Sequence, residues 1–93
     1  MTLRNRFLDA VIDGHIGNGI VVTRKQFMDF FAQDSATTTG CFLSNSEIET
    51  GLHSPSYNHF TLRVSEGTYR IHPVALRIRM EQRGILPVAV EVA

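Results

Sequence analysis

Glycine and proline divide this chain into segments that are too short for a long helix or a broad sheet. Gly14 ends the first segment, Gly67 and Pro73 bound a later one, and Gly84 ends the last long one. Because the chain has only 93 residues, a second hydrophobic core would have too little sequence to bury itself. We therefore expect one domain, residues 1–93, built from short helices and strands.

The composition is that of a folded, water-soluble domain. The chain is 43% hydrophobic and 19% charged, values that disfavour a disordered tail. No apolar run approaches the roughly 20 residues that span a bilayer, and no continuous apolar region follows Arg4 and Arg6 as it would in a secretion signal. The single cysteine, Cys41, suits a reducing compartment. We expect a cytoplasmic protein without a membrane partner.

Charge is balanced in total but unevenly distributed. Nine basic and nine acidic residues give a net charge of zero, which argues against strong nonspecific binding to nucleic acid. Residues 1–50 hold four basic and six acidic side chains, whereas residues 51–93 hold five basic and three acidic ones. Eight of the nine basic residues are arginine, whose planar guanidinium suits bidentate contacts to phosphate, guanine or carboxylate.

The first half of the chain predicts two helices and a short strand. Apolar residues at helical spacing predict a helix over 3–13 with Thr2 as its cap, and a β-branched run predicts a strand over 20–22. Thr23 and Gln26 match a capping box at the start of a helix over 24–33. Residues 34–40 look like a loop. The apolar face of the second helix would carry Phe27, Phe30 and Phe31.

The second half predicts two more helix starts and then a strand, a helix and an edge strand. A helix should begin within 44–48, and Ser54 followed by Pro55 is a strong start signal for a helix that ends at Glu66-Gly67. That helix would bury Tyr57, Phe60, Thr61 and Val64 in one stripe. The later predictions are a strand over 68–72, a helix over 73–83 and a strand over Ile85–Val92. Pro87 lies within the last of these, so we expect it at the edge of a sheet.

The region around 45–72 resembles the helix-turn-helix of bacterial and phage DNA-binding proteins. The residues that carry the resemblance are Glu47, Ile48, Gly51, Ser54, Pro55 and Ser56. The strand and arginines that follow resemble the hairpin side of a winged variant. The resemblance implies a small winged-helix-like α+β domain, with four or five helices and a two- or three-stranded sheet. The 54–64 helix would then read duplex DNA as part of a small regulator.

The resemblance also implies which side chains would contact DNA. The residues nearest the bases would be Asn58, His59, Leu62 and Arg63. Asparagine pairs with adenine and arginine with guanine. Ser54 and Ser56 would lie near the phosphates. The flanking backbone would be held by Arg70, Arg77 and Arg79. Such regulators usually dimerise to read paired half-sites, and the apolar Ile85–Val92 edge is a plausible homodimer element.

No pattern of catalytic or metal-binding residues stands out. His53 and His59 are six positions apart, whereas a helical zinc site favours histidines at i and i+4 or paired cysteines. His59-Phe60-Thr61 has the form of half a phosphoesterase signature, but no similarly spaced second copy follows. The sequence also lacks a glycine-rich phosphate loop between a strand and a helix. We expect a non-enzymatic protein with no cofactor and no metal.

A protein-binding module is the alternative. A neutral chain with acids in one half and arginines in the other is suited to docking on a host protein complex. Small phage proteins that inhibit host defence machinery, anti-CRISPR proteins among them, are often single domains without a catalytic set. Some of them use a DNA-binding fold, so the fold alone does not choose between the two functions.

Overall fold

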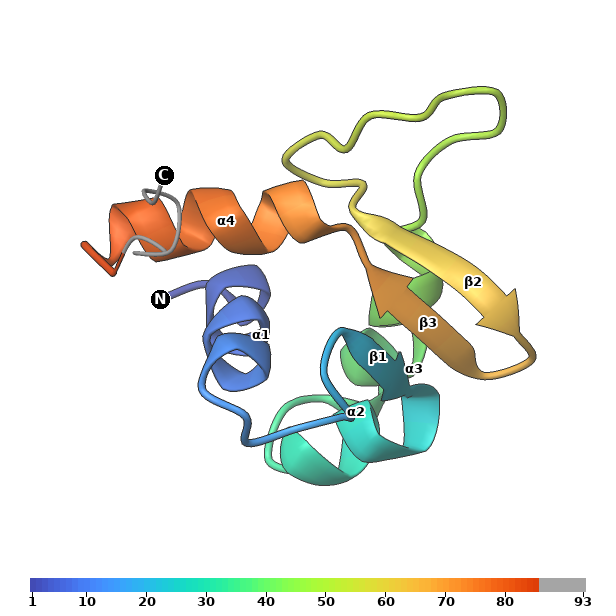
Figure 1. Cartoon of the computed structure of the whole chain (residues 1–93). Helices are drawn as coiled ribbons and strands as arrows, with labels where there is room; N and C mark the ends of the chain where they lie inside the picture. Colours follow the sequence, from blue (N-terminus) through green and yellow to red (C-terminus); the bar gives the residue numbers. More distant parts are fainter. Residues whose placement is uncertain (86–93) are drawn as a thin grey trace.

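The computed structural model describes residues 1–85, which form an α+β domain of four helices and a three-stranded antiparallel sheet. The prediction of a small α+β domain is therefore confirmed. Figure 1 shows α4 lying across α1 at one side and the β2–β3 hairpin at the other. In chain order the elements are α1 (Leu3–Ile12), β1 (Val21–Thr23), α2 (Arg24–Phe30), α3 (Ala36–Asn45), β2 (Thr61–Ser65), β3 (Thr68–Ile71) and α4 (Pro73–Gln82).

The sheet has the strand order β1–β3–β2, with both pairings antiparallel. Tyr69 on the central strand is opposite Val22 on one side and Arg63 on the other. β2 and β3 form a hairpin through Glu66-Gly67, and Gly67 has a φ of +71°. Glycine adopts this left-handed conformation without the steric cost that a Cβ imposes.

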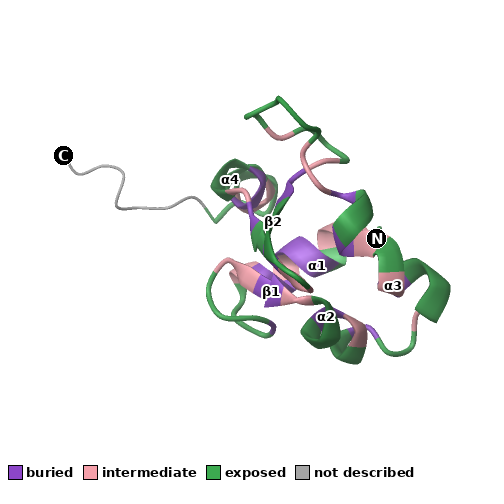
Figure 2. Ribbon diagram, turned by 90° about the vertical axis from the view of Figure 1, so that its right-hand side faces the viewer, coloured by how far each residue is buried: buried purple, intermediate pink, exposed green. Residues whose placement is uncertain are grey.

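Phenylalanine rings from three helices and the loop before β2 form the centre of the core. Phe7 of α1 makes an edge contact with Phe27 of α2 at a centroid distance of 5.0 Å, and Phe27 stacks on Phe42 of α3 at 5.1 Å. Phe60 is also buried, with a centroid 6.5 Å from that of Phe7. Figure 2 shows buried positions on α1 and β1 in the middle of the molecule. Burial of these rings supplies much of the hydrophobic stabilisation.

The local start signals in the first half of the chain are confirmed. Thr2 caps α1 by accepting a hydrogen bond from the backbone N–H of Asn5, and Thr23 and Gln26 form the expected capping box on α2. α2 ends at Phe30, three residues earlier than predicted, and Phe30 is exposed whereas Phe27 and Phe31 are buried.

The predicted loop over 34–40 is wrong, because α3 begins at Ala36. Three threonines and a glycine give residues 37–40 a low intrinsic helix propensity. Tertiary packing overrides that preference, since Thr39 and Leu43 are buried against the core and the N–H of Thr39 donates to the carbonyl of Ser35. The predicted helix start within 44–48 is also wrong: α3 ends there, at Asn45.

The predicted helix over 54–66 is wrong as well. Residues 54–60 are loop and Thr61–Ser65 is strand β2. A strand here pairs with β3 and completes the hairpin, whereas a helix would leave one edge of β3 without hydrogen bonds. Phe60 and Thr61 are buried as predicted, but Tyr57 and Val64 are more than half exposed.

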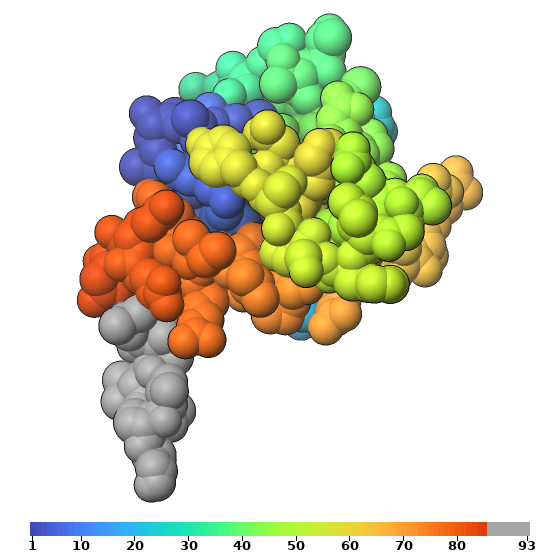
Figure 3. Space-filling view, turned by 90° about the horizontal axis from the view of Figure 1, so that it is seen from above, coloured from blue at the N-terminus to red at the C-terminus, as the bar shows by residue number. Residues whose placement is uncertain are grey.

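The long loop over 46–60 is closed at its base. The carbonyl of Ser46 accepts hydrogen bonds from the N–H groups of Phe60 and Thr61 at 2.7 and 2.9 Å. The N–H of Ile48 donates to the carbonyl of Thr61 at 2.9 Å. In Figure 3 this loop, drawn in yellow-green, lies on the surface beside α4 in orange. The loop therefore projects from the domain without separating α3 from β2.

The predicted edge strand Ile85–Val92 lies outside the described residues except for Ile85, which follows the end of α4. Gly84 has a φ of +75° just past that end, where a C-terminal glycine was expected. Among residues 1–85, none of the helices combines the length and the apolar character needed to cross a membrane.

Candidate nucleic-acid interface

α2 and α3 form a packed helix pair joined by residues 31–35. The stacked rings of Phe27 and Phe42, with an interplanar angle of 9°, hold the pair together from the inside. Thr39 and Leu43 place the inner face of α3 against the core. The other face of α3 is consequently presented to solvent.

Arg24 connects the helix pair to the hairpin. Its Nε donates to the carbonyl of Gly40 on α3 at 2.9 Å, and its backbone N–H donates to the carbonyl of Gly67 in the hairpin turn at 2.8 Å. A Cβ on residue 40 would lie 3.0 Å from the guanidinium of Arg24, so glycine lets the arginine approach α3 closely. One residue thereby fixes α3 and the hairpin relative to each other.

The solvent-facing side of α3 is polar and uncharged. Hydroxyl, thiol and amide groups of this kind donate or accept hydrogen bonds without carrying a net charge. We call this surface the α3 face, and it consists of the exposed residues Ala36, Thr37, Thr38, Cys41, Ser44 and Asn45.

Basic side chains gather between the start of α2 and the hairpin. Arg24, Lys25 and Arg63 line one hollow of about 650 Å³ between the start of α2 and the hairpin, together with Glu66. Arg24 and Arg63 make no ion pair within residues 1–85, whereas Lys25 pairs with Asp29 at 2.8 Å on an exposed surface. The guanidinium groups of Arg24 and Arg63 therefore remain available to an anionic partner.

Four of the residues predicted to contact DNA lie in the 46–60 loop and not on a helix. Ser54 and Ser56 line a groove beside α4, and Asn58 is exposed in the loop. Nδ1 of His59 lies 2.9 Å from the carbonyl oxygen of Glu47 and helps close the base of the loop. None of these four residues belongs to the α3 face.

The two hairpin arginines point to opposite faces. Arg63 is paired with Tyr69, and Arg70 is paired with Leu62, its neighbour on β2. Successive residues of a strand alternate between the two faces of a sheet. Arg63 therefore lies on the face that lines the hollow, and Arg70 lies on the opposite face. Of the predicted set, only Arg63 is brought together with the cations of α2.

The two predicted arginines of α4 are engaged in ion pairs. Arg77 pairs with Glu81 at 3.5 Å on an exposed turn. Arg79 donates to both carboxylate oxygens of Asp9, at 2.8 and 3.0 Å. This contact raises the pKa of Arg79 and lowers that of Asp9. Arg79 is thereby occupied in joining α4 to α1.

Sequence reasoning missed the α3 face together with Arg24 and Lys25. A usable signal was present, because Ser35 precedes an inward-facing set at helical spacing formed by Thr39, Phe42 and Leu43. The threonine run concealed it. Within residues 1–85, no group of three or more histidine, cysteine, aspartate or glutamate side chains is placed to hold a metal ion.

The fold and this surface together define a small α+β domain in which a helix pair lies beside a β-hairpin. Comparisons with models of known protein families, with curated protein sequences and with solved structures yield no match.

Proposed function

We propose that this chain is a winged-helix DNA-binding module that presents α3 to the major groove. The observation that carries the proposal is the order of elements: the α2–α3 helix pair is followed, after the 46–60 loop, by the β2–β3 hairpin, and Arg24 joins the two. A helix pair of this kind places its second helix in the major groove. The reading helix is thus α3 and not the segment 54–64.

The chemistry of the exposed residues supports this arrangement. Thr38 and Asn45 on the α3 face offer groups suited to base edges, since asparagine pairs with adenine and a threonine methyl contacts thymine. Arg24 is hydrogen-bonded to Gly40 of α3, and Lys25 and Arg63 line the same hollow as Arg24. In the proposed complex these three side chains would contact phosphates. Three phosphate contacts give a slope of log affinity against log salt of about −2.7.

Fluorescence anisotropy with a random-sequence duplex tests the proposal. Raising the salt from about 50 to about 200 mM should weaken binding by about 40-fold for three phosphate contacts. Arg63→Gln should weaken binding and flatten the slope by about 0.9. Arg77→Gln, a matched change at an exposed arginine on α4, is the control and should leave both unchanged. Absence of binding at the lower salt, or equal losses in the two variants, would contradict the proposal.

Dimerisation is part of the proposal, because paired half-sites match a two-fold symmetric protein. The segment expected to mediate it, Ile85–Val92, lies almost entirely outside the described residues. Light scattering over a wide concentration range tests this directly. A monomer at every concentration, with and without DNA, would contradict the dimer.

Binding to a protein is the second candidate, and it is favoured by the uncharged α3 face in a chain of zero net charge. Under this alternative, Thr38→Arg would abolish capture of a specific host complex, and Arg63→Gln would leave DNA retention at background. Under the DNA-binding proposal, Arg63→Gln lowers DNA affinity instead. The two variants therefore separate the two functions.

A further inference from the structure

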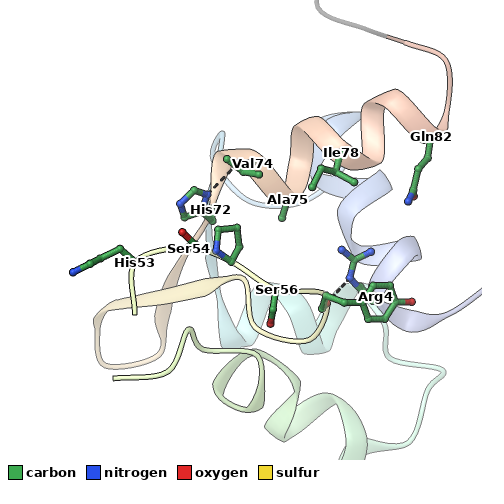
Figure 4. Close-up of a pocket in the computed structure, with 11 residues that line it drawn as sticks. Arg4, His53, Ser54, Ser56, His72, Val74, Ala75, Ile78 and Gln82 are labelled. Carbon is green, nitrogen blue, oxygen red and sulfur yellow. Dashed lines mark hydrogen bonds between the residues drawn. The ribbon is translucent and has the colours of Figure 1, made fainter. Parts of the chain in front are cut away.

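A groove separate from the α3 face runs between α4 and the segment 53–57 of the long loop. Its volume is about 510 Å³, which is within the range of small-molecule sites. Figure 4 shows Val74, Ala75 and Ile78 of α4 on one side and the loop on the other. None of its lining residues belongs to α3, β2 or β3.

The walls of the groove are mainly apolar and partly open to solvent. Val74 and Ile78, four positions apart on α4, are 42% and 44% exposed, and Tyr57 on the loop is 58% exposed. Pro55 adds to the loop side. Exposed apolar side chains that converge on one concave surface favour an occupant with a hydrocarbon body.

Arg4 supplies a positive charge at one end of this groove. Its Nε donates to the carbonyl of Tyr57 at 2.8 Å, and its guanidinium carbon lies 4.2 Å from the centre of the Tyr57 ring. Nη1 donates to Asn5 at 3.0 Å. Within residues 1–85, Nη2 has no hydrogen-bond partner and Arg4 has no carboxylate partner. In Figure 4 the terminal nitrogens point across the groove toward α4.

The surroundings of Arg4 disfavour its charge. Partial burial lowers the pKa of Arg4; Tyr57 offsets part of this effect, and the positive charge of Arg79 adds to it. An anion placed at the guanidinium would offset both effects and would complete its hydrogen bonds. The apolar walls and the cation thus select for different parts of the same ligand.

We propose that this groove binds a small amphiphilic carboxylate, an aromatic or short aliphatic acid whose carboxylate pairs with Arg4. The hydrocarbon part lies between Tyr57 and the Val74–Ile78 face of α4. The proposal does not depend on DNA binding, since the groove shares no residue with the α3 face or with the hollow that Arg24, Lys25 and Arg63 line.

Nuclear magnetic resonance titration of the full chain with benzoate, 4-phenylbutyrate and octanoate tests the proposal. At least one acid should give saturable shifts centred on Val74, Ile78 and Tyr57. The neutral analogues benzyl alcohol, 4-phenylbutanol and octanol should bind at least about tenfold more weakly, because a hydrogen bond to a charged group is lost. Arg4→Gln should cause a similar loss for the acids.

Ile78→Ser reports on the apolar wall independently of Arg4, and Arg77→Gln serves as the control on α4. Ile78→Ser should weaken the binding of acids and of alcohols alike, and Arg77→Gln should weaken the binding of neither. The proposal is overturned by absence of saturable shifts with all three acids, by equal affinities for acids and alcohols, or by shifts centred elsewhere.

Discussion

Arg79 and Asp9 form a bidentate ion pair between α4 and α1, with N–O distances of 2.8 and 3.0 Å. Their side chains are only 13% and 20% exposed, so water screens the pair less than it screens a surface ion pair. Arg83 adds longer contacts to Asp9 and Asp13. The last described helix is thus attached to the first one by charge as well as by apolar packing.

Removing either partner of this pair should destabilise the fold. We expect Arg79→Gln and Asp9→Asn each to lower the free energy of unfolding by about 1–3 kcal/mol, because the remaining partner loses charged hydrogen bonds. Urea denaturation of both single variants and the double variant gives the coupling energy. The same cycle on the exposed pair Lys25–Asp29 should give at most about 0.5 kcal/mol. Equal coupling in the two cycles would contradict the prediction.

The same pair should make stability depend on pH in the acid range. The hydrogen bonds from Arg79 hold the pKa of Asp9 below its ordinary value of 3.8. A carboxyl whose pKa is lowered in the folded state stabilises the fold above its unfolded pKa, and the effect is lost as pH falls through the folded value. The stability difference between wild type and Asp9→Asn should therefore shrink as pH falls from about 5 to below 3. A difference that is constant over this range in urea denaturation would refute the assignment.

Gly17 and Gly14 offer a matched test of close packing in the turn after α1. Both have positive φ values, +78° and +76°, but a Cβ on residue 17 would lie 2.7 Å from the carbonyl oxygen of Val21 and from Cγ2 of Val22. Nothing lies within 4 Å of a Cβ on residue 14. Gly14→Ala should cost about 1 kcal/mol from backbone strain, and Gly17→Ala at least about 1 kcal/mol more from overpacking. Thermal unfolding that ranks the two variants equally would contradict this.

Thr61 should be more sensitive to loss of its hydroxyl than to loss of its methyl group. The side chain is fully buried, and its Oγ1 donates to the carbonyl of Leu43 at 2.9 Å. Thr61→Val keeps the volume but removes the donor, and it should cost about 1–2 kcal/mol. Thr61→Ser keeps the bond and should cost less. Chemical denaturation distinguishes the two; the reverse order would show that packing dominates at this position.

Local signals in the sequence predicted the fold correctly where side chains form hydrogen bonds with backbone groups only a few residues away. Thr23 and Gln26 are an example, because the capping box uses only its own turn. The same logic failed at Ser54-Pro55, where a strong start signal is followed by β2. β2 forms by pairing with β3, which is a contact between separate segments. The helical spacing of apolar residues that include Phe60 and Thr61 carries no information about that pairing.

The candidate interface was less predictable than the fold. Arg63 was in the predicted set and lines the hollow beside the cations of α2. The α3 face was missed because Thr37, Thr38 and Thr39 look like loop residues in isolation. Core contacts of Thr39, Phe42 and Leu43 stabilise that segment as a helix. Arg79 shows the opposite error, since an arginine near other arginines suggested an anion site, whereas its partner Asp9 is 70 positions away.

The hydrogen-bonded base of the 46–60 loop has a consequence for how such a chain can diverge. Ser46 is joined to Phe60 and Thr61, so the ends of the loop stay together whatever its length. Doubling the length of a flexible loop costs only about 0.6 kcal/mol in closure entropy. Insertions and deletions at the tip would therefore be tolerated during evolution, and the loop side of the groove beside α4 can change while the helix pair and hairpin keep their geometry.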